Sequence, residues 1–375
     1  MILAFIFIIC IFTGASFYVG RRIFQALAFL FPNVNGIIYA CIYIIIAVSF
    51  ILDRLPLPSF IKGVAGWIGT YWTGLFFYLL LFFIASDLIV LIGSAVRLIP
   101  AGTLVNVRFY AGTVAILLSA GVVCYGVYNA NKIIFVSYDV QLNERLPEKI
   151  NIVFMADLHL GGIKSEKRIQ GIVKGINSLK PDIVCIAGDI FTDDYYRVKN
   201  PGRASALLGS IEAKYGVYAS LGNHDGGSTL NEMMDFLERS NIKLLNDEHI
   251  IIDERLILIG RLDSSPIGGF GELSRKDFSQ VMAQADINLP VVVMDHNPGN
   301  MGEYGGEVDL ILAGHTHRGQ LFPGSLFTRL LFTADYGHYQ KDPGSPHVIV
   351  TQGVGTWMIP MRVGTNNEIV SVVLR

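Results

Sequence analysis

The pattern of hydrophobic and polar positions changes near residue 131. Before this point, long uncharged apolar runs alternate with short turn-rich pieces, whereas from residue 133 onward short β-branched runs alternate with amphipathic segments. A bilayer core about 30 Å thick needs roughly 20 apolar residues per helix, and four runs suit that length: 1–20, 34–52, 63–86 and 109–131. The pattern predicts a multi-pass transmembrane helical region at 1–131, a connecting strand and linker at 132–148, and a second domain at 149–375.

The distribution of charge strengthens this division. The chain has 29 Lys and Arg residues and 31 Asp and Glu residues, and residues 1–131 hold only eight of them: Arg21, Arg22, Asp53, Arg54, Lys62, Asp87, Arg97 and Arg108. This distribution excludes a single soluble domain and a disordered chain. A net charge of −2 gives no electrostatic signature of nucleic-acid binding, so we expect a bilayer and no nucleic acid among the partners.

The side of the membrane that the second domain faces stays open. Four spans would place this domain on the side of the N-terminus. Three to five Lys and Arg residues near the spans lie on that side and four on the other, depending on whether Arg145 and Lys149 are counted. The positive-inside rule therefore does not decide. Asp87 is expected at the end of the third span, and a functional intramembrane carboxylate is the alternative.

Residues 133–375 follow an α/β pattern. Helical spacing predicts helices at 166–179 and 231–240, and short apolar runs predict strands between them. Strands that alternate with helices indicate parallel pairing, and hairpin-like pieces at 250–252 and 256–259 indicate mixed sheets. The expected strands are 133–140, 151–156, 182–187, 216–221, 250–252, 256–259, 289–294, 308–313, 348–351 and 369–374.

Polar residues follow five of these strands. The strands end in Asp157-Leu158-His159, Gly188-Asp189, Gly222-Asn223-His224-Asp225, Asp295-His296-Asn297 and Gly314-His315-Thr316-His317. Any one of these motifs could be an ordinary turn, but five of the eight histidines lie in them. Because ligands of open α/β sheets bind beyond the carboxyl ends of the strands, we expect these side chains to meet in one crevice.

The residue types predict a site for two metal ions. Carboxylates, an amide oxygen and imidazoles suit divalent transition ions such as Mn, Fe or Zn, and the motifs contain no cysteine for a structural zinc site. The donors exceed the needs of one tetrahedral ion, and a shared carboxylate would hold two ions about 3.5–4 Å apart, the spacing used for in-line displacement at phosphorus. We therefore expect a metal-bridging hydroxide to attack phosphorus.

The order of the motifs resembles the calcineurin-like metallophosphoesterase family. That order is DxH, GD, GNHD, a single His and GHxH, from about residue 151 to His317. The segments 314–320 (GHTHRGQ) and 355–369 (GTWMIPMRVGTNNEI) are similar to the membrane-associated bacterial branch of the family. The resemblance implies an α/β fold, a four-layer sandwich of two mixed sheets flanked by helices, here preceded by about four transmembrane helices.

By motif position, the resemblance also implies which residues hold the metals. The two sites would share Asp189 as a bridging ligand. The first metal would be held by Asp157, His159, Asp189 and His317, and the second by Asp189, Asn223, His296 and His315.

The resemblance further implies a catalytic pair. His224 would stabilise the transition state or protonate the leaving oxygen, and Asp225 would orient His224. The family often has the pattern GDxxD, but here Thr192 occupies the last position, and Asp193 and Asp194 follow it. A hydrogen-bonding role for that acid is therefore open.

Four further residues each have a functional and a structural interpretation. Arg318 and Gln320 are candidates for contact with substrate phosphate, with a surface role as the alternative. Trp357 and Arg362 are candidates for the rim of the pocket, with packing of the C-terminal segment as the alternative.

Together these patterns predict a membrane-anchored, dinuclear metal-dependent phosphoesterase in the cell membrane. The membrane region favours a lipid-linked phosphodiester or pyrophosphate as substrate, by analogy alone. The alternative is a membrane transporter or channel with a regulatory nucleotide-binding domain. A scaffold that has lost catalysis is a third hypothesis, which the complete set of motif ligands disfavours. The natural metals, the choice between mono- and diesters, and the oligomeric state stay open.

Overall fold

The computed structural model describes residues 2–52, 55–142, 146, 148–162, 165–283, 285 and 288–375. Asp53, Arg54 and Arg145, which were counted above, lie outside these residues. The chain forms two compact units, Met1–Val127 and Tyr128–Arg375.

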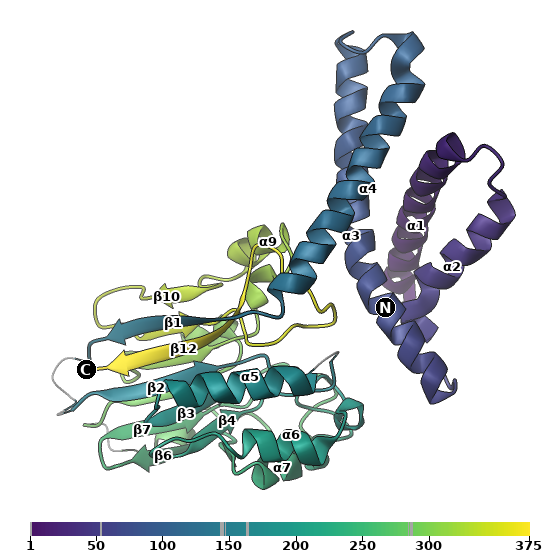
Figure 1. Ribbon diagram of the computed structural model, residues 1–375. Coiled ribbons are helices and arrows are strands. Elements are labelled where there is room, and N and C mark those ends of the chain that lie inside the picture. Colours follow the sequence, from purple (N-terminus) through teal and green to yellow (C-terminus); the bar gives the residue numbers. More distant parts are fainter. Residues whose placement is uncertain are drawn as a thin grey trace. The chain divides into compact units, whose positions relative to one another are not determined.

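The N-terminal unit is built from four apolar helices (Figure 1): α1 (Ile2–Leu30), α2 (Gly36–Leu52), α3 (Ser59–Ala95) and α4 (Leu104–Asn129). Within the described residues, three helices are long and apolar enough to cross a membrane: Ile6–Leu30, Phe60–Ala95 and Ala101–Asn129. Three of the about four predicted spans thus have a helix of sufficient length, and α2 is a shorter apolar helix of 17 residues.

Two helices continue past the charges that were expected to end them. Helix α1 runs through Arg21 and Arg22, and α3 runs past Asp87 for eight more residues. Asp87 therefore lies inside α3 and not at its end, which corrects the prediction. The Arg22 Nη2 atom lies 3.2 Å from Asp87 Oδ1, and the Tyr18 hydroxyl donates to Asp87 Oδ2 over 2.6 Å. A partnered carboxylate and guanidinium can remain inside apolar helices, since each charge is compensated.

The C-terminal unit contains two six-stranded mixed sheets. The first has the order β1-β12-β2-β3-β4-β5 and the second has the order β10-β11-β9-β8-β7-β6. Both are mainly parallel, with antiparallel pairs at β12–β2 in the first and at β10–β11 and β6–β7 in the second. The strands are β1 (Ile133–Val140), β2 (Ile150–Met155), β3 (Ile183–Ala187), β4 (Val217–Ser220), β5 (Lys243–Leu244), β6 (Glu248–Ile252), β7 (Leu256–Gly260), β8 (Val291–Met294), β9 (Leu310–Ala313), β10 (Gly337–Tyr339), β11 (His347–Val350) and β12 (Asn367–Leu374).

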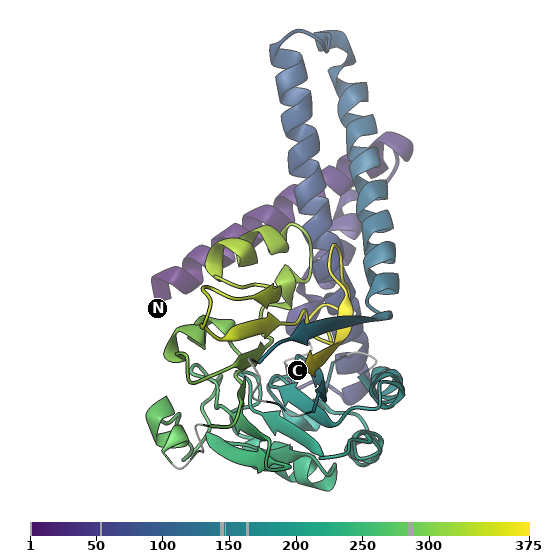
Figure 2. The ribbon, with the colours of Figure 1, turned by 90° about the vertical axis from the view of Figure 1, so that its left-hand side faces the viewer.

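Three hydrophobic cores arrange this unit in four layers. One core joins the outer face of the first sheet to helices α5 (Ser165–Ser178), α6 (Pro201–Leu208) and α7 (Leu230–Arg239). Figure 2 shows teal helices of this layer end-on beside the sheet. A second core lies between the two sheets, and a third covers the far face of the second sheet together with α8 (Phe278–Met282). Helix α9 (Gly324–Leu331) lies between β9 and β10 in the chain and has no buried residue.

The predicted strands are confirmed to within two residues at each end, and the α/β sandwich is confirmed as well. The helices at 166–179 and 231–240 correspond to α5 and α7. The sequence analysis missed the short elements α6, α8, α9, β5 and β10. With two to eight residues each, these segments contain too few periods of the hydrophobic pattern to be recognised.

Candidate metal centre

The predicted site residues lie at the carboxyl ends of strands from both sheets. In the first sheet they follow β2, β3 and β4, and in the second they follow β8 and β9. Because these strands are parallel to their neighbours in each sheet, the following loops emerge at one edge, where both sheets contribute side chains. The residues are Asp157 and His159 after β2, Asp189 after β3, Asn223 and His224 after β4, His296 after β8, and His315 and His317 after β9.

One group of potential metal ligands contains Asp157, His159 and His317, whose donor atoms all lie within 4.8 Å of one another. The Nε2 atom of His317 is 3.3 Å from Asp157 Oδ1 and 3.1 Å from His159 Nε2. All three residues are buried. This is the set that was predicted for the first metal, apart from the shared Asp189.

A second group contains Asp189, His296 and His315, again within 4.8 Å. The Oδ2 atom of Asp189 is 3.2 Å from His296 Nε2 and 3.8 Å from His159 Nε2 of the first group. Asn223 adds its Oδ1 atom, 2.9 Å from His315 Nδ1. The structure thus places all seven predicted ligands together with Asp189 between the groups, while metal binding itself stays a prediction.

The chemistry of these side chains fits divalent cations. Burial lowers the pKa of His159 and of His315 to about 4, so both rings are neutral at pH 7 and have a lone pair to donate. Burial raises the pKa of Asp157 to about 7, as expected for a carboxylate that lacks a sufficient positive charge nearby. The buried Nε2 atom of His296 makes no hydrogen bond among the described residues, although Asp189 Oδ2 lies 3.2 Å away. In the neutral ring this nitrogen has a lone pair that a divalent cation would accept.

The backbone at the ligands is strained. Asp157, His159, Asp189, His315 and His317 all have φ between 47° and 69°, a region that non-glycine residues rarely adopt. Such strain concentrates at functional sites, where surrounding contacts maintain it. One such contact is the close approach of the loops at Gly222, where a Cβ atom would lie 2.3 Å from the backbone nitrogen of Asp189.

His224 lies beside the two groups, and its partner differs from the prediction. The Nδ1 atom of His224 is 2.5 Å from Asp193 Oδ1. Asp225 is fully buried and instead accepts hydrogen bonds from the backbone nitrogens of Phe191 and Gly222, both over 2.8 Å. The prediction that Asp225 orients His224 is therefore corrected: Asp193 makes this contact, and Asp225 ties two site loops together. The sequence analysis did not identify Asp193 as this partner, because Asp193 lies one position later than the last acid of the GDxxD pattern.

The protonation of His224 follows from its surroundings. Burial by itself would lower the pKa of His224, but the hydrogen bond to Asp193 and the charge of Asp189 outweigh burial and raise the pKa above its usual value. Because a carboxylate can only accept, Nδ1 carries the proton and Nε2 is the atom left for exchange with a substrate. The backbone nitrogen of His224 also donates to Asp189 Oδ1 over 2.9 Å, which couples the histidine to the shared carboxylate.

Beside this site is a cavity of about 430 Å³, lined by residues that include Asp189, His224, His317, Gln320 and Trp357. The Gln320 amide holds the Trp357 loop, because it donates to the Trp357 carbonyl over 3.0 Å and accepts from the Trp357 nitrogen over 2.8 Å. Trp357 thus lines the cavity, which agrees with the prediction that it forms part of the pocket rim.

Arg318 and Arg362, which were candidates for substrate contact and for the pocket rim, make contacts with other parts of the protein. The Arg318 guanidinium lies over the Tyr336 ring, 4.4 Å from its centroid. Arg362 is fully buried, where its Nη2 atom lies 3.2 Å from His317 Nδ1 and donates to the Gly355 carbonyl over 2.7 Å. Arg362 therefore supports the ring of His317 from behind and does not form the rim of the pocket.

The chain is similar to several known proteins. Residues 150–319 match the family model of the calcineurin-like phosphoesterases. An uncharacterized metallophosphoesterase of Aquifex aeolicus is 32% identical over 235 residues, which cover 62% of this chain and 88% of that protein. A transmembrane protein with metallophosphoesterase domain from Danio rerio is 28% identical over 288 residues, which cover 71% of this chain and 63% of that protein. A solved structure of a dimetal phosphatase from Danio rerio has 15% identity and a TM-score of 0.35, over 54% of this chain and 87% of the other.

The similarity to the Aquifex aeolicus protein covers most of that protein's length. The aligned family region, 150–319, contains every strand end that supplies the two ligand groups. The chain belongs to the calcineurin-like metallophosphoesterase family and is a hydrolase of phosphoester bonds.

Proposed function

We propose that the chain is a membrane-anchored dimetal phosphoesterase whose two ions are held by the groups around Asp157 and Asp189. The observation that carries this proposal is the position of Asp189, which lies between the two groups and accepts a hydrogen bond from the backbone of His224. Two divalent cations bound there would lower the pKa of a water molecule and stabilise the negative charge of the phosphoryl oxygens. Mn, Fe and Zn all suit the donor set.

The residues of the chain itself would position the ester and provide a proton. The cavity beside Asp189 and His224 would hold the phosphoryl group. His224 would donate a proton from Nε2 to the leaving oxygen, since its Nδ1 atom is engaged by Asp193, and general acids of this kind contribute typically 10²–10⁴-fold. Asp193 would keep the ring in this orientation through Nδ1.

Exchange of Asp193 for asparagine is expected to lower kcat by about 10–100-fold, the usual effect of losing a carboxylate that orients a site histidine. The KM value and the melting temperature should change little, because the Asp193 side chain is 48% exposed. The matched variant Asp225→Asn should instead destabilise the fold by about 1–3 kcal/mol, since one buried backbone N–H would lose its acceptor. Kinetics and thermal unfolding of both variants measure this. Equal loss of kcat in two equally stable variants would contradict the assignment.

We further propose that the substrate is a lipid-linked phosphodiester or pyrophosphate at a membrane surface. The support is an apolar face formed by Phe322, Leu326, Phe327, Leu330 and Leu331, on α9 and just before it, all of them exposed. Helix α9 begins four residues after Gln320, which lines the cavity. Contiguous exposed apolar side chains on this scale mark an interaction surface, and a bilayer is the partner that suits a chain with three helices of membrane-spanning length.

The chain also enters the C-terminal unit beside this surface. The Asn129 amide, at the end of α4, donates to the carbonyls of Arg362 and Thr365 over 3.2 and 2.7 Å. The loop that contains Arg362 and Thr365 also pairs with the segment before α9, through the β-bridge between Leu321 and Val363. Asn129 and the segment before α9 thus contact the same loop, so the apolar face lies close to the point where the chain enters the C-terminal unit.

Introduction of an acid into the apolar face, Leu330→Asp, is expected to reduce hydrolysis of a phosphoester lipid in vesicles roughly tenfold or more, because insertion of one large apolar side chain is worth about 1.5–3 kcal/mol. Hydrolysis of a soluble diester should stay within about twofold, since Leu330 is 83% exposed and surface changes seldom alter the fold. The control is Ile251→Asp, at another exposed apolar position. Parallel assays on both substrates measure this, and an equal effect on both would argue against a lipid substrate.

The alternative, a transporter or channel with a regulatory domain, predicts ion or solute flux that persists without hydrolysis. Reconstituted protein with an Asp189→Asn exchange would distinguish the two. Flux in that variant would favour the alternative, whereas loss of hydrolysis without any flux supports the phosphoesterase.

A further inference from the structure

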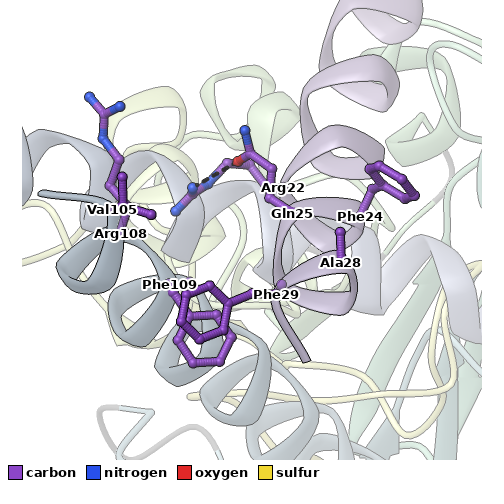
Figure 3. A pocket seen from close by; sticks show the side chains of 10 residues that line it. Arg22, Phe24, Gln25, Ala28, Phe29, Val105, Arg108 and Phe109 are labelled. Carbon is purple, nitrogen blue, oxygen red and sulfur yellow. Dashed lines mark hydrogen bonds between the residues drawn. The ribbon is translucent and has the colours of Figure 1, made fainter. Parts of the chain in front are cut away.

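A second cavity lies within the N-terminal unit between α1 and α4. Its volume is about 430 Å³, and its lining includes Arg22, Gln25 and Phe29 of α1 and Arg108 and Phe109 of α4. Figure 3 shows Arg22 extending from α1 toward α4, and Arg108 on the α4 side of the same space. Arg22 is buried between apolar helices, where a charge is costly, whereas Arg108 is exposed at the edge of the same space.

Arg22 is the polar group that defines this cavity. Its exposed fraction is only 8%, although its guanidinium has several donors. One of them, Nη1, donates to Gln25 Oε1 over 3.2 Å, and Nη2 lies 3.2 Å from Asp87 Oδ1. The Nε atom makes no hydrogen bond among the described residues, and Nη2 has only the ion pair with Asp87. Buried donors of a charged group that make no hydrogen bond destabilise the structure unless a ligand accepts from them.

Helix α4 makes room for the guanidinium at Gly112. A Cβ atom at this position would lie 3.2 Å from Arg22 Nη2, which is closer than a relaxed contact. Glycine therefore permits the guanidinium to reach the surface of α4, next to the position of Arg108 one turn earlier along the helix. Arg22 and Arg108 can then bind the same ligand, one from α1 and the other from α4.

The charge of the cavity favours an anion. None of the described residues that line it is acidic. Asp87, outside the lining, compensates one of the two arginines, so one positive charge remains. Guanidinium groups bind phosphate through paired hydrogen bonds that are stronger than neutral ones.

The position of the arginines along the helices and the walls of the cavity indicate the source of that phosphate. Arg108 is four residues from the start of α4 and Arg22 is eight residues from the end of α1, which correspond to roughly 6 and 12 Å along the helix axes. Arg108 therefore lies near a helix end, where phospholipid headgroups meet the apolar core, and Arg22 lies about two helical turns inside α1. The rings of Phe29 and Phe109 stack at 3.9 Å between centroids and form an apolar wall beside the charges.

We propose that this cavity binds the phosphate group of an anionic phospholipid. The phosphate oxygens accept hydrogen bonds from Arg22 and Arg108, and the apolar part of the lipid packs against Phe29 and Phe109. Such a site makes the folding of the N-terminal unit depend on membrane composition. It does not rest on the hydrolytic activity, because none of the metal ligands contributes to it.

Thermal unfolding of the full chain in neutral detergent tests the proposal, with phosphatidylglycerol, phosphatidylcholine or inorganic phosphate added as probes. We expect phosphatidylglycerol to raise the melting temperature and the other two to leave it unchanged. The Arg108→Gln variant should need roughly tenfold more phosphatidylglycerol for the same shift, the loss expected for one hydrogen bond to a charged group. Arg108 is preferred to Arg22 for exchange, because loss of the partner of Asp87 risks misfolding.

The matched control is Arg97→Gln, which removes a charge that does not belong to the lining and should behave like the unmodified chain. An unchanged melting temperature without added lipid verifies that each variant is folded. An equal response of Arg108→Gln and Arg97→Gln would overturn the proposal. So would an equal shift with inorganic phosphate, which would exclude a lipid as the specific ligand.

Discussion

Exchange of Asp189 for asparagine is expected to lower kcat/KM on a phosphoester roughly 10³-fold or more. Asp189 is the carboxylate that connects the two ligand groups, with His296 Nε2 at 3.2 Å and His159 Nε2 at 3.8 Å from its Oδ2 atom. The neutral amide would weaken the binding of both ions at once. Metal ions supply several kcal/mol of transition-state stabilisation, and each 1.36 kcal/mol corresponds to about tenfold in rate. Steady-state kinetics with added Mn²⁺ measure the loss.

A second measurement separates loss of metal from loss of folding. Mn²⁺ should raise the melting temperature of the unmodified chain, since it binds the native state alone, and should fail to do so in the Asp189→Asn variant. The control is Asp139→Asn, an exposed acid paired with Arg375 over 2.8 Å, which should keep both activity and stabilisation by metal. If the Asp189→Asn variant retained more than about a tenth of the activity, far above the loss that metal catalysis implies, the shared-ligand assignment would be wrong.

Replacement of His224 by alanine is expected to lower kcat about 10²–10⁴-fold while metal binding is retained, because the side chain provides general acid catalysis. The ring is well placed for this role, with its Nδ1 atom engaged by Asp193 and its centroid 6.0 Å from that of Trp357, on the cavity wall. The loss should be large for alkyl esters and small for esters of acidic phenols, whose leaving oxygens need little protonation. A series of esters with different leaving groups measures this dependence.

The control for this variant is His338→Gln, an exposed histidine outside the ligand groups, which should hydrolyse all esters normally. Stabilisation by Mn²⁺ should be the same in the His224→Ala variant as in the unmodified chain. A loss that did not depend on the leaving group would contradict general acid catalysis by His224, and a loss of stabilisation by metal would reassign this residue to the ligand set.

Much of the site could be predicted from the sequence because its signals are local. Each motif directly follows an apolar strand, and in a parallel sheet the residues after each strand emerge at the same edge. Asp157 and His159 after β2, and His315 and His317 after β9, therefore needed only the strand assignment and the sheet rule. No neighbouring residue had to be known for these side chains to be placed.

The partner of His224 could not be predicted in the same way. Asp193 and Asp225 are both close in sequence to the motifs, and both are carboxylates. The structure distinguishes them because Asp225 points into the buried backbone of two loops, whereas Asp193 reaches the ring from a partly exposed loop. Hydrogen bonds depend on direction and on distance within tenths of an ångström, and neither is encoded in the spacing of two residues along the chain.

By itself, the sequence determined the division into an apolar helical part and an α/β part, the family, and the set of residues at the strand ends. These features follow from hydrophobic period and local motifs, which are properties of neighbouring residues. Only the tertiary structure decided that α1 and α3 continue past Arg22 and Asp87, that α2 is shorter than the other apolar helices, and that Asp193 is the residue that holds His224. Each of these depends on contacts between distant residues, such as an ion pair 65 positions apart, whose energy exists only after the fold has brought the two groups together.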